Sequence, residues 1–121
     1  MDNGVMVIAD YLCTSNKKQL NIISMYRHIF NGVVKAGISE ETIEARLDAL
    51  QVLKTLPQAK SVTIGRNLQW YTPREVLIVT ADFENKSDWE AFVASPEHTA
   101  LNEVASEVFD LEKSCGYQIE Y

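Results

Sequence analysis

The sequence is poor in the residues that build disulfide frameworks and metal centres, with only two cysteines, Cys13 and Cys115, and only two histidines, His28 and His98. The N-terminal segment does not resemble a signal peptide, because Asp10 interrupts its short apolar run. We therefore expect two reduced thiols in a cytoplasmic protein. Two histidines without His-x₃-His spacing are too few for a closed metal site, so we expect no metal and no cofactor.

The chain also lacks a surplus of basic residues, a long apolar run and the loops that hold phosphates. Its 11 Lys and Arg residues are outnumbered by 17 Asp and Glu residues, which gives a net charge of −6. This balance argues against nucleic acid and anionic membranes as partners, because both require basic surface. No apolar segment approaches the ~20 residues of a membrane-spanning helix. A Gly-rich phosphate loop, a Gly-x-Ser-x-Gly elbow and the basic-aromatic strand of RNA-recognition domains are also missing.

Apolar residues, in contrast, make up 46% of the 121 residues, enough for one core but not for two. We expect a single domain over residues 25–121. Residues 1–24 are an N-terminal extension in this interpretation, with room for an extra strand at 5–12.

Two segments have helical signals. Ser39 is a good N-cap, and the apolar residues that follow it at helical spacing predict a helix that Pro57 ends. The second segment begins with Ser-Asp-Trp-Glu at 87–90, which has the pattern of a capping box. It restarts at Ser95, with Pro96 at the first helical position.

Alternating or continuous apolar residues predict four strands, at 26–35, 61–66, 75–83 and 115–121. The resulting order, βαββαβ, predicts an α+β, ferredoxin-like fold with both helices on one face of a four-stranded antiparallel sheet. The run from Val76 to Val79 is apolar on both faces, although the helices cover only one. The simplest solution is a homodimer through the open sheet face, and a monomer with a ligand-lined open sheet is the alternative.

Four short segments resemble one known family: Tyr-Arg-His-Ile-Phe at 26–30, Ser-Glu-Glu at 39–41, Val-Thr-Ile-Gly-Arg-Asn at 62–67, and Phe-Val-Ala-Ser-Pro-Glu-His at 92–98. In this order they are similar to the stress-responsive A/B barrel domain, a dimeric α+β barrel. The resemblance extends over residues 26–121. The family includes the plant olivetolic acid cyclase, which closes a polyketide by an intramolecular aldol reaction.

The resemblance implies that His98 is a catalytic residue and that His28 lines the same pocket. Phe92 stands where the cyclase has a tyrosine. The residues we expect around the ligand are Phe30, Phe92, Leu101 and Tyr117.

His98 also stands out without the resemblance, because it precedes Leu101 by three residues and so shares the apolar face of its helix. The positive end of the helix dipole keeps its ring neutral and able to accept a proton. The alternative is a structural histidine that hydrogen-bonds a backbone group to order the turn at Pro96. His28 is likewise either a core histidine bonded to a neighbouring strand or a polar group of a cavity. The exposed aromatics Trp70 and Tyr71 are expected at a dimer seam, or else as a lid over a pocket.

These expectations favour a small homodimeric protein that binds a small apolar molecule or acts as an accessory protein. The alternative is a cofactor-free enzyme, similar to the polyketide cyclase, in which His98 is a general base and His28 orients the substrate. A third alternative is a dimeric barrel similar to the monooxygenases of antibiotic biosynthesis.

Overall fold

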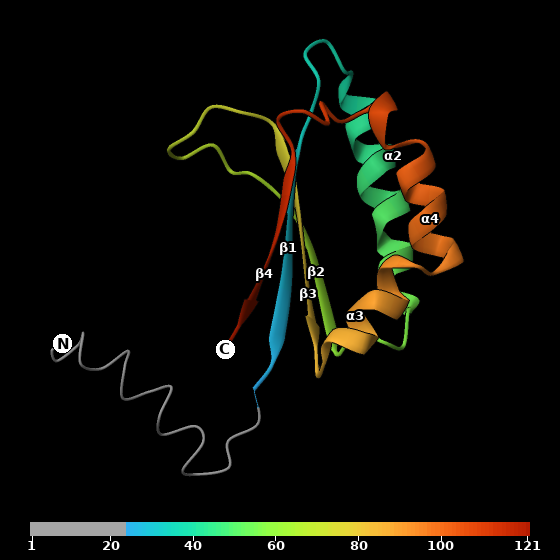
Figure 1. The fold of residues 1–121 in the computed structure, drawn as a ribbon. Helices are drawn as coiled ribbons and strands as arrows, with labels where there is room; N and C mark the ends of the chain where they lie inside the picture. Colours follow the sequence, from blue (N-terminus) through green and yellow to red (C-terminus); the bar gives the residue numbers. More distant parts are fainter. Residues whose placement is uncertain (1–23) are drawn as a thin grey trace, which may run out of the picture.

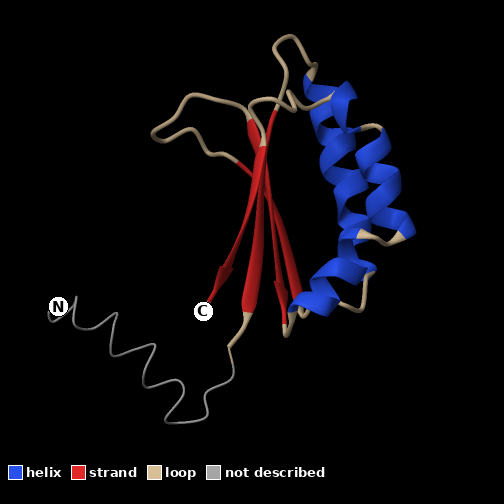
Figure 2. Cartoon of the chain, viewed as in Figure 1, coloured by secondary structure: helices blue, strands red, loops and turns tan. Residues whose placement is uncertain are grey.

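The computed structural model describes residues 24–121, which form one antiparallel sheet with its helices packed on one side. Figures 1 and 2 show the two layers edge on. The expected N-terminal extension, its strand at 5–12 and Cys13 lie outside the described residues. The elements along the chain are β1 (Tyr26–Val33), α2 (Glu40–Leu50), the 3₁₀ helix η1 (Gln51–Thr55), β2 (Ser61–Arg66), β3 (Val76–Phe83), α3 (Lys86–Val93), α4 (Pro96–Glu103), the 3₁₀ helix η2 (Ala105–Glu107) and β4 (Cys115–Glu120).

The sheet has the strand order β2-β3-β1-β4 and is antiparallel throughout, which confirms the ferredoxin-like α+β prediction. β1 is central and pairs with β3 and β4. Because His28 lies opposite Ala81 and Phe30 opposite Val79, these residues share the face that the helices cover. Arg27, Ile29 and Asn31 alternate with them along β1 and lie on the open face.

The helix α2 begins as predicted, with the Ser39 side chain accepting a hydrogen bond from the Thr42 backbone N–H at 3.1 Å. It ends earlier than predicted. Residues 51–55 form a 3₁₀ turn instead of a further α-helical turn. The tighter turn still buries Leu53, so the apolar stripe continues across the change.

In the second helical segment, one predicted N-cap is wrong and the other is confirmed. The helix α3 starts at Lys86, because the side chain of Asn85, not Ser87, accepts the Asp88 N–H at 2.8 Å. Asn caps helices as well as Ser does, and Asn85 has the extended backbone that a cap requires. At α4, Ser95 caps the helix with Pro96 at the first position, as predicted.

The core lies between the sheet and the helices and is centred on aromatic pairs. Phe83 and Phe92 are both 1% exposed and meet edge to face, with ring centroids 5.1 Å apart. Phe30 and Phe109 form a second edge-to-face pair at 5.6 Å. Gly32 makes room for this pair, because a Cβ there would lie 2.5 Å from the Phe109 ring. The core therefore depends on a strand position without a side chain.

Candidate functional site

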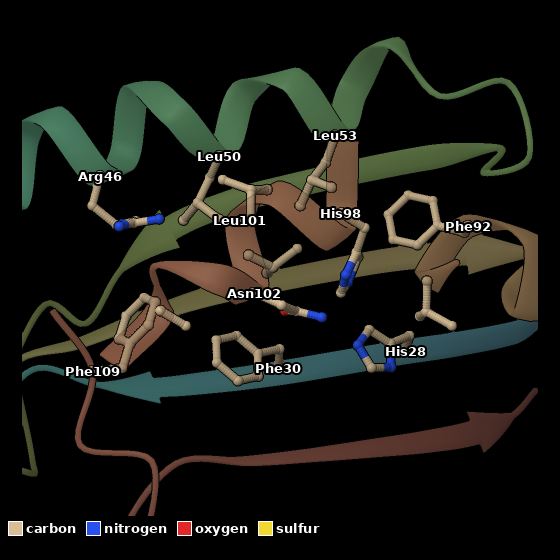
Figure 3. A pocket seen from close by; sticks show the side chains of 13 residues that line it. His28, Phe30, Arg46, Leu50, Leu53, Phe92, His98, Leu101, Asn102 and Phe109 are labelled. Atoms are coloured by element: carbon tan, nitrogen blue, oxygen red, sulfur yellow. The ribbon is translucent and has the colours of Figure 1, made fainter. Parts of the chain in front are cut away.

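A cavity of about 210 Å³ lies between the helix-covered face of the sheet and the helices (Figure 3). It is smaller than the ~300–1,000 Å³ of drug-sized ligand sites. Asn102 is exposed, so the cavity borders on solvent there. Its lining is mostly apolar: His28, Phe30, Arg46, Leu50, Leu53, Val79, Phe92, Val93, His98, Leu101, Asn102, Ala105 and Phe109.

The structure brings together five of the six residues expected at the site, namely His28, Phe30, Phe92, His98 and Leu101. Tyr117 is the exception. It pairs with Ile29 in the register of β1 and β4, which places its side chain on the open face, 59% exposed. The expectation that Tyr117 lines the pocket is therefore wrong. The alternating pattern of the strand did not specify which of its two faces the helices cover.

His98 reaches the cavity because the turn before it is fixed by Ser95. The Ser95 hydroxyl donates to the Phe92 carbonyl at 2.8 Å and accepts the His98 backbone N–H at 3.1 Å. Ser95 thus orders the turn through the backbone and leaves the imidazole free of that task. Among residues 24–121, the buried Nδ1 atom of His98 has no hydrogen-bond partner. Burial lowers the pKa of His98, so the ring is neutral near pH 7.

His28 reaches the cavity from β1 and is held by two neighbours. Its Nδ1 atom accepts a hydrogen bond from the Trp89 indole at 3.3 Å and lies 2.8 Å from the Gln118 side-chain nitrogen. Because an indole N–H can only donate, Nδ1 carries no proton and Nε2–H is the ring's donor. Burial, and then the nearby His98, lower the pKa of His28. The two rings point toward one another from opposite walls of the cavity (Figure 3).

Phe92 adds bulk to the cavity wall but no polar group. Its ring packs against His98 with centroids 5.6 Å apart and against Phe83 on the other side. The resemblance to the cyclase implies a tyrosine at this position, and Phe92 lacks its hydroxyl. In this chain, the polar groups of the cavity come from elsewhere.

Four polar residues at or near the cavity were missed by sequence reasoning. Trp89 and Gln118 hold His28, and Arg46 and Asn102 line the cavity itself. The helical spacing of Arg46 and Asn102 in the sequence could have predicted their place in the cavity. Arg46 follows the buried Ile43 by three residues and precedes Leu50 by four, so it lies on the apolar face of its helix. Asn102 follows His98 by four.

Two other expectations concern the rest of the described chain. Trp70 and Tyr71, 89% and 97% exposed, lie in the β2–β3 loop and do not line the cavity. Over residues 24–121, no cluster of three or more His, Cys, Asp or Glu side chains is placed to hold a metal ion. The described helices are also too short or too polar to cross a membrane.

A family model described as the stress responsive A/B barrel domain matches residues 27–113, most of the chain. The chain belongs to this family. The match includes the first strand with His28 and the Ser95-Pro96 turn with His98, the two elements that hold the histidines of the cavity. No curated protein matches the chain.

Solved structures from several organisms have the same fold as this A/B barrel protein. A dimeric ferredoxin-like protein of unknown function from Thermobifida fusca is 18% identical, with 81% of this chain and 90% of that chain covered and a TM-score of 0.66. Hydroxynitrile lyase from Passiflora edulis is 16% identical, with 80% and 93% covered and a TM-score of 0.67. A Dabb-family protein from Mesorhizobium loti is 17% identical, with 81% and 95% covered and a TM-score of 0.59. At these identities the likeness shows the fold alone.

Proposed function

We propose that this A/B barrel protein binds a small, mainly apolar molecule in the cavity between its sheet and helices. The observation that carries the proposal is the cavity of about 210 Å³ with His28 and His98 on opposite walls. Most of its lining side chains are aliphatic or aromatic, which favours an apolar ligand body. The buried Nδ1 of His98, which has no partner in the described part of the chain, adds a site for one polar group, because leaving such an atom unpaired costs about 1–3 kcal/mol.

A cavity-filling variant tests the binding proposal. Ala105→Leu adds three carbons to the cavity wall, and Ala100→Leu makes the same change at an exposed position on α4 that does not line the cavity. Ligand-observed NMR with p-cresol should show binding to the wild type and to Ala100→Leu, and a loss of binding to Ala105→Leu. Equal binding to all three proteins would show that p-cresol does not occupy the cavity and would count against the proposal.

A second candidate function is proton abstraction next to a carbonyl group, with His98 as the general base. The lowered pKa of His98 favours this role, because the neutral ring can accept a proton near pH 7. The Nε2–H of His28 is a donor that can polarise the carbonyl oxygen. The α C–H bond breaks, its proton passes to His98, and the electron pair forms the enolate that His28 stabilises. A structural neighbour that is a hydroxynitrile lyase supports a search for such chemistry.

Deuterium exchange checks this second candidate directly. In D₂O, the protein should accelerate exchange of the α protons of 4-phenyl-2-butanone, as read by NMR. His98→Gln should lower the rate by ~10²–10⁴-fold, the typical contribution of a general base. The same variant should keep p-cresol binding within severalfold. Exchange that is unchanged in His98→Gln rejects the enzymatic role and leaves the binding role intact.

The open sheet face is the proposed homodimer interface. It carries Ile29 and Ile78 opposite the helices, with Ile119 46% exposed and Tyr117 59% exposed. The dimeric ferredoxin-like protein from Thermobifida fusca has the same fold, which supports the proposal. Light scattering at micromolar concentration should give the mass of two chains, and Ile78→Lys should give the mass of one. Glu103→Lys on an exposed position of α4 is the control and should stay dimeric.

A further inference from the structure

Arg46 is a charged residue in a place where charge is costly. Its side chain projects from α2 into the cavity, at the end away from His28 and His98 (Figure 3), and the residue is only 8% exposed. Its Nη2 atom donates one hydrogen bond to the Val104 carbonyl at 3.3 Å. Its Nε atom is buried without a partner among residues 24–121.

Two other arginines of the described chain have the carboxylate partner that Arg46 lacks. Arg27 pairs with Asp82, and Arg66 binds the carboxylates of Glu40, Glu44 and Glu75. Over residues 24–121, no carboxylate lies within 4.0 Å of the Arg46 guanidinium. None of the described residues that line the cavity is an Asp or a Glu. Leaving a buried Nε–H without an acceptor on a largely buried guanidinium costs free energy, which an anion bound there would offset.

We infer that Arg46 binds the carboxylate of the cavity's ligand, so the molecule that occupies the cavity is an apolar monocarboxylate. This inference rests on the proposed binding function and deepens it. The apolar body then lies along Phe30, Leu50 and Leu101, toward the histidines. The acid group sits at the far end, on the guanidinium.

The geometry needed already occurs in this chain. The Nε and Nη2 atoms of Arg27 bind the two oxygens of Asp82 at 2.7 and 3.2 Å, a side-on pair. In Arg46 the Nε–H has no partner among residues 24–121, and Nη2 has a second hydrogen besides the one that binds the Val104 carbonyl. A carboxylate fits this planar fork with two parallel hydrogen bonds, whereas an amide, which has one oxygen, can use only half of it.

A pair of nearly isosteric probes tests the inference. Phenylacetate and phenylacetamide have the same apolar body and differ in charge at one end. Calorimetric titration of the wild-type protein should show phenylacetate binding roughly 10- to 100-fold more tightly than phenylacetamide, as expected for hydrogen bonds to a charged group. Arg46→Met should remove this preference. The control Arg74→Met, which removes the same charge from an exposed position outside the cavity, should retain it.

The outcomes separate this inference from the binding function beneath it. Equal affinities of the two probes for the wild type, or equal losses in Arg46→Met and Arg74→Met, overturn the role of Arg46 and leave cavity binding in place. If neither probe binds at roughly 10 mM, a concentration that detects even very weak sites, both proposals fall. Thermal melts of the ligand-free proteins add a second readout. Arg46→Met should melt at or above the wild-type temperature, whereas a lower melting temperature would mark Arg46 as a structural residue.

Discussion

The two faces of the sheet differ in whether their polar side-chain atoms have hydrogen-bond partners. On the open face, Arg27 and Ser61 both bind Asp82, and the Arg27 guanidinium also lies over the ring of Tyr121 at 4.7 Å. On the helix-covered face, the cavity holds a buried His98 Nδ1 and a buried Arg46 Nε, neither with a partner in the described part of the chain. The Asp82 cluster is thus paired within the described residues, whereas these two atoms of the cavity are not.

This contrast separates the polar groups that the fold pairs internally from those that the proposed function assigns to a ligand. A buried polar atom without a partner costs free energy, and a bound molecule or a role in chemistry can offset that cost. The Asp82 cluster is complete within the chain and stabilises the sheet. The Nδ1 atom of His98 and the Nε atom of Arg46 have no partner among residues 24–121, and the proposals above concern them for that reason.

The largest expected difference between the faces is in apolar packing. Phe92→Ala removes a fully buried ring between Phe83 and His98 and should lower the free energy of unfolding by about 3–5 kcal/mol. Ile119→Ala, at a 46% exposed position of the open face, should cost under about 1 kcal/mol in the monomeric state. Urea unfolding of both variants measures this. Similar losses at the two positions would mean that the open face is as tightly packed as the core.

A matched glycine pair gives the next largest contrast. Gly32→Ala places a methyl group 2.5 Å from the Phe109 ring and should cost about 1–3 kcal/mol through overpacking. Gly65→Ala makes the same change on the open face of β2, where no other described residue lies within 4 Å of the added Cβ, and should be neutral or slightly stabilising. Thermal unfolding compares them. A stable Gly32→Ala protein would show that Phe30 and Phe109 can repack.

On the open face, Asp82→Asn tests whether the polar cluster is structural. The substitution keeps the shape of the side chain but removes the charge that binds Arg27, and should cost about 1–2 kcal/mol. Ligand binding in the cavity should not change, because Asp82 lies on the opposite face. Asp48→Asn, at an exposed position of α2, is the control. A loss of p-cresol binding in Asp82→Asn would contradict the separation of the faces.

The smallest effect is a difference in pH dependence. Burial lowers the pKa values of His28 and His98, so the unfolded chain binds their protons first. Stability should therefore fall as the pH drops below about 6.5, the ordinary histidine value. The Arg27 guanidinium lowers the pKa of Asp82, so its contribution is fully present above about pH 3.9 and is lost in more acidic solution.

Melting temperatures measured from neutral to acidic pH should show these two windows separately. His28→Gln with His98→Gln should flatten the first window and leave the second, and Asp82→Asn should do the reverse. A double-histidine variant with an unaltered first window would show that other groups titrate there.

The fold could be predicted from the sequence almost completely, whereas the site could be predicted only in part. Strand alternation, the Ser39 and Ser95 caps and the order of elements specify the ferredoxin-like topology, because each signal is local. The capping error at Asn85 arose because two good cap residues stand two positions apart. Tyr117 was misplaced because an alternating strand has two faces, and only its register with β1 decides which one the helices cover.

The sequence by itself determined the elements, the family and the placement of His98 one turn into a capped helix. Only the tertiary structure decided that His28 and His98 face one cavity, that Trp89 and Gln118 hold His28, and that Arg46 is buried there without a carboxylate from residues 24–121. The physical reason is distance along the chain: His28 and Trp89 are 61 residues apart, and His28 and Gln118 are 90 apart. Periodicity places a residue on a face, but whether a polar group finds its partner depends on which segments the fold brings to that face.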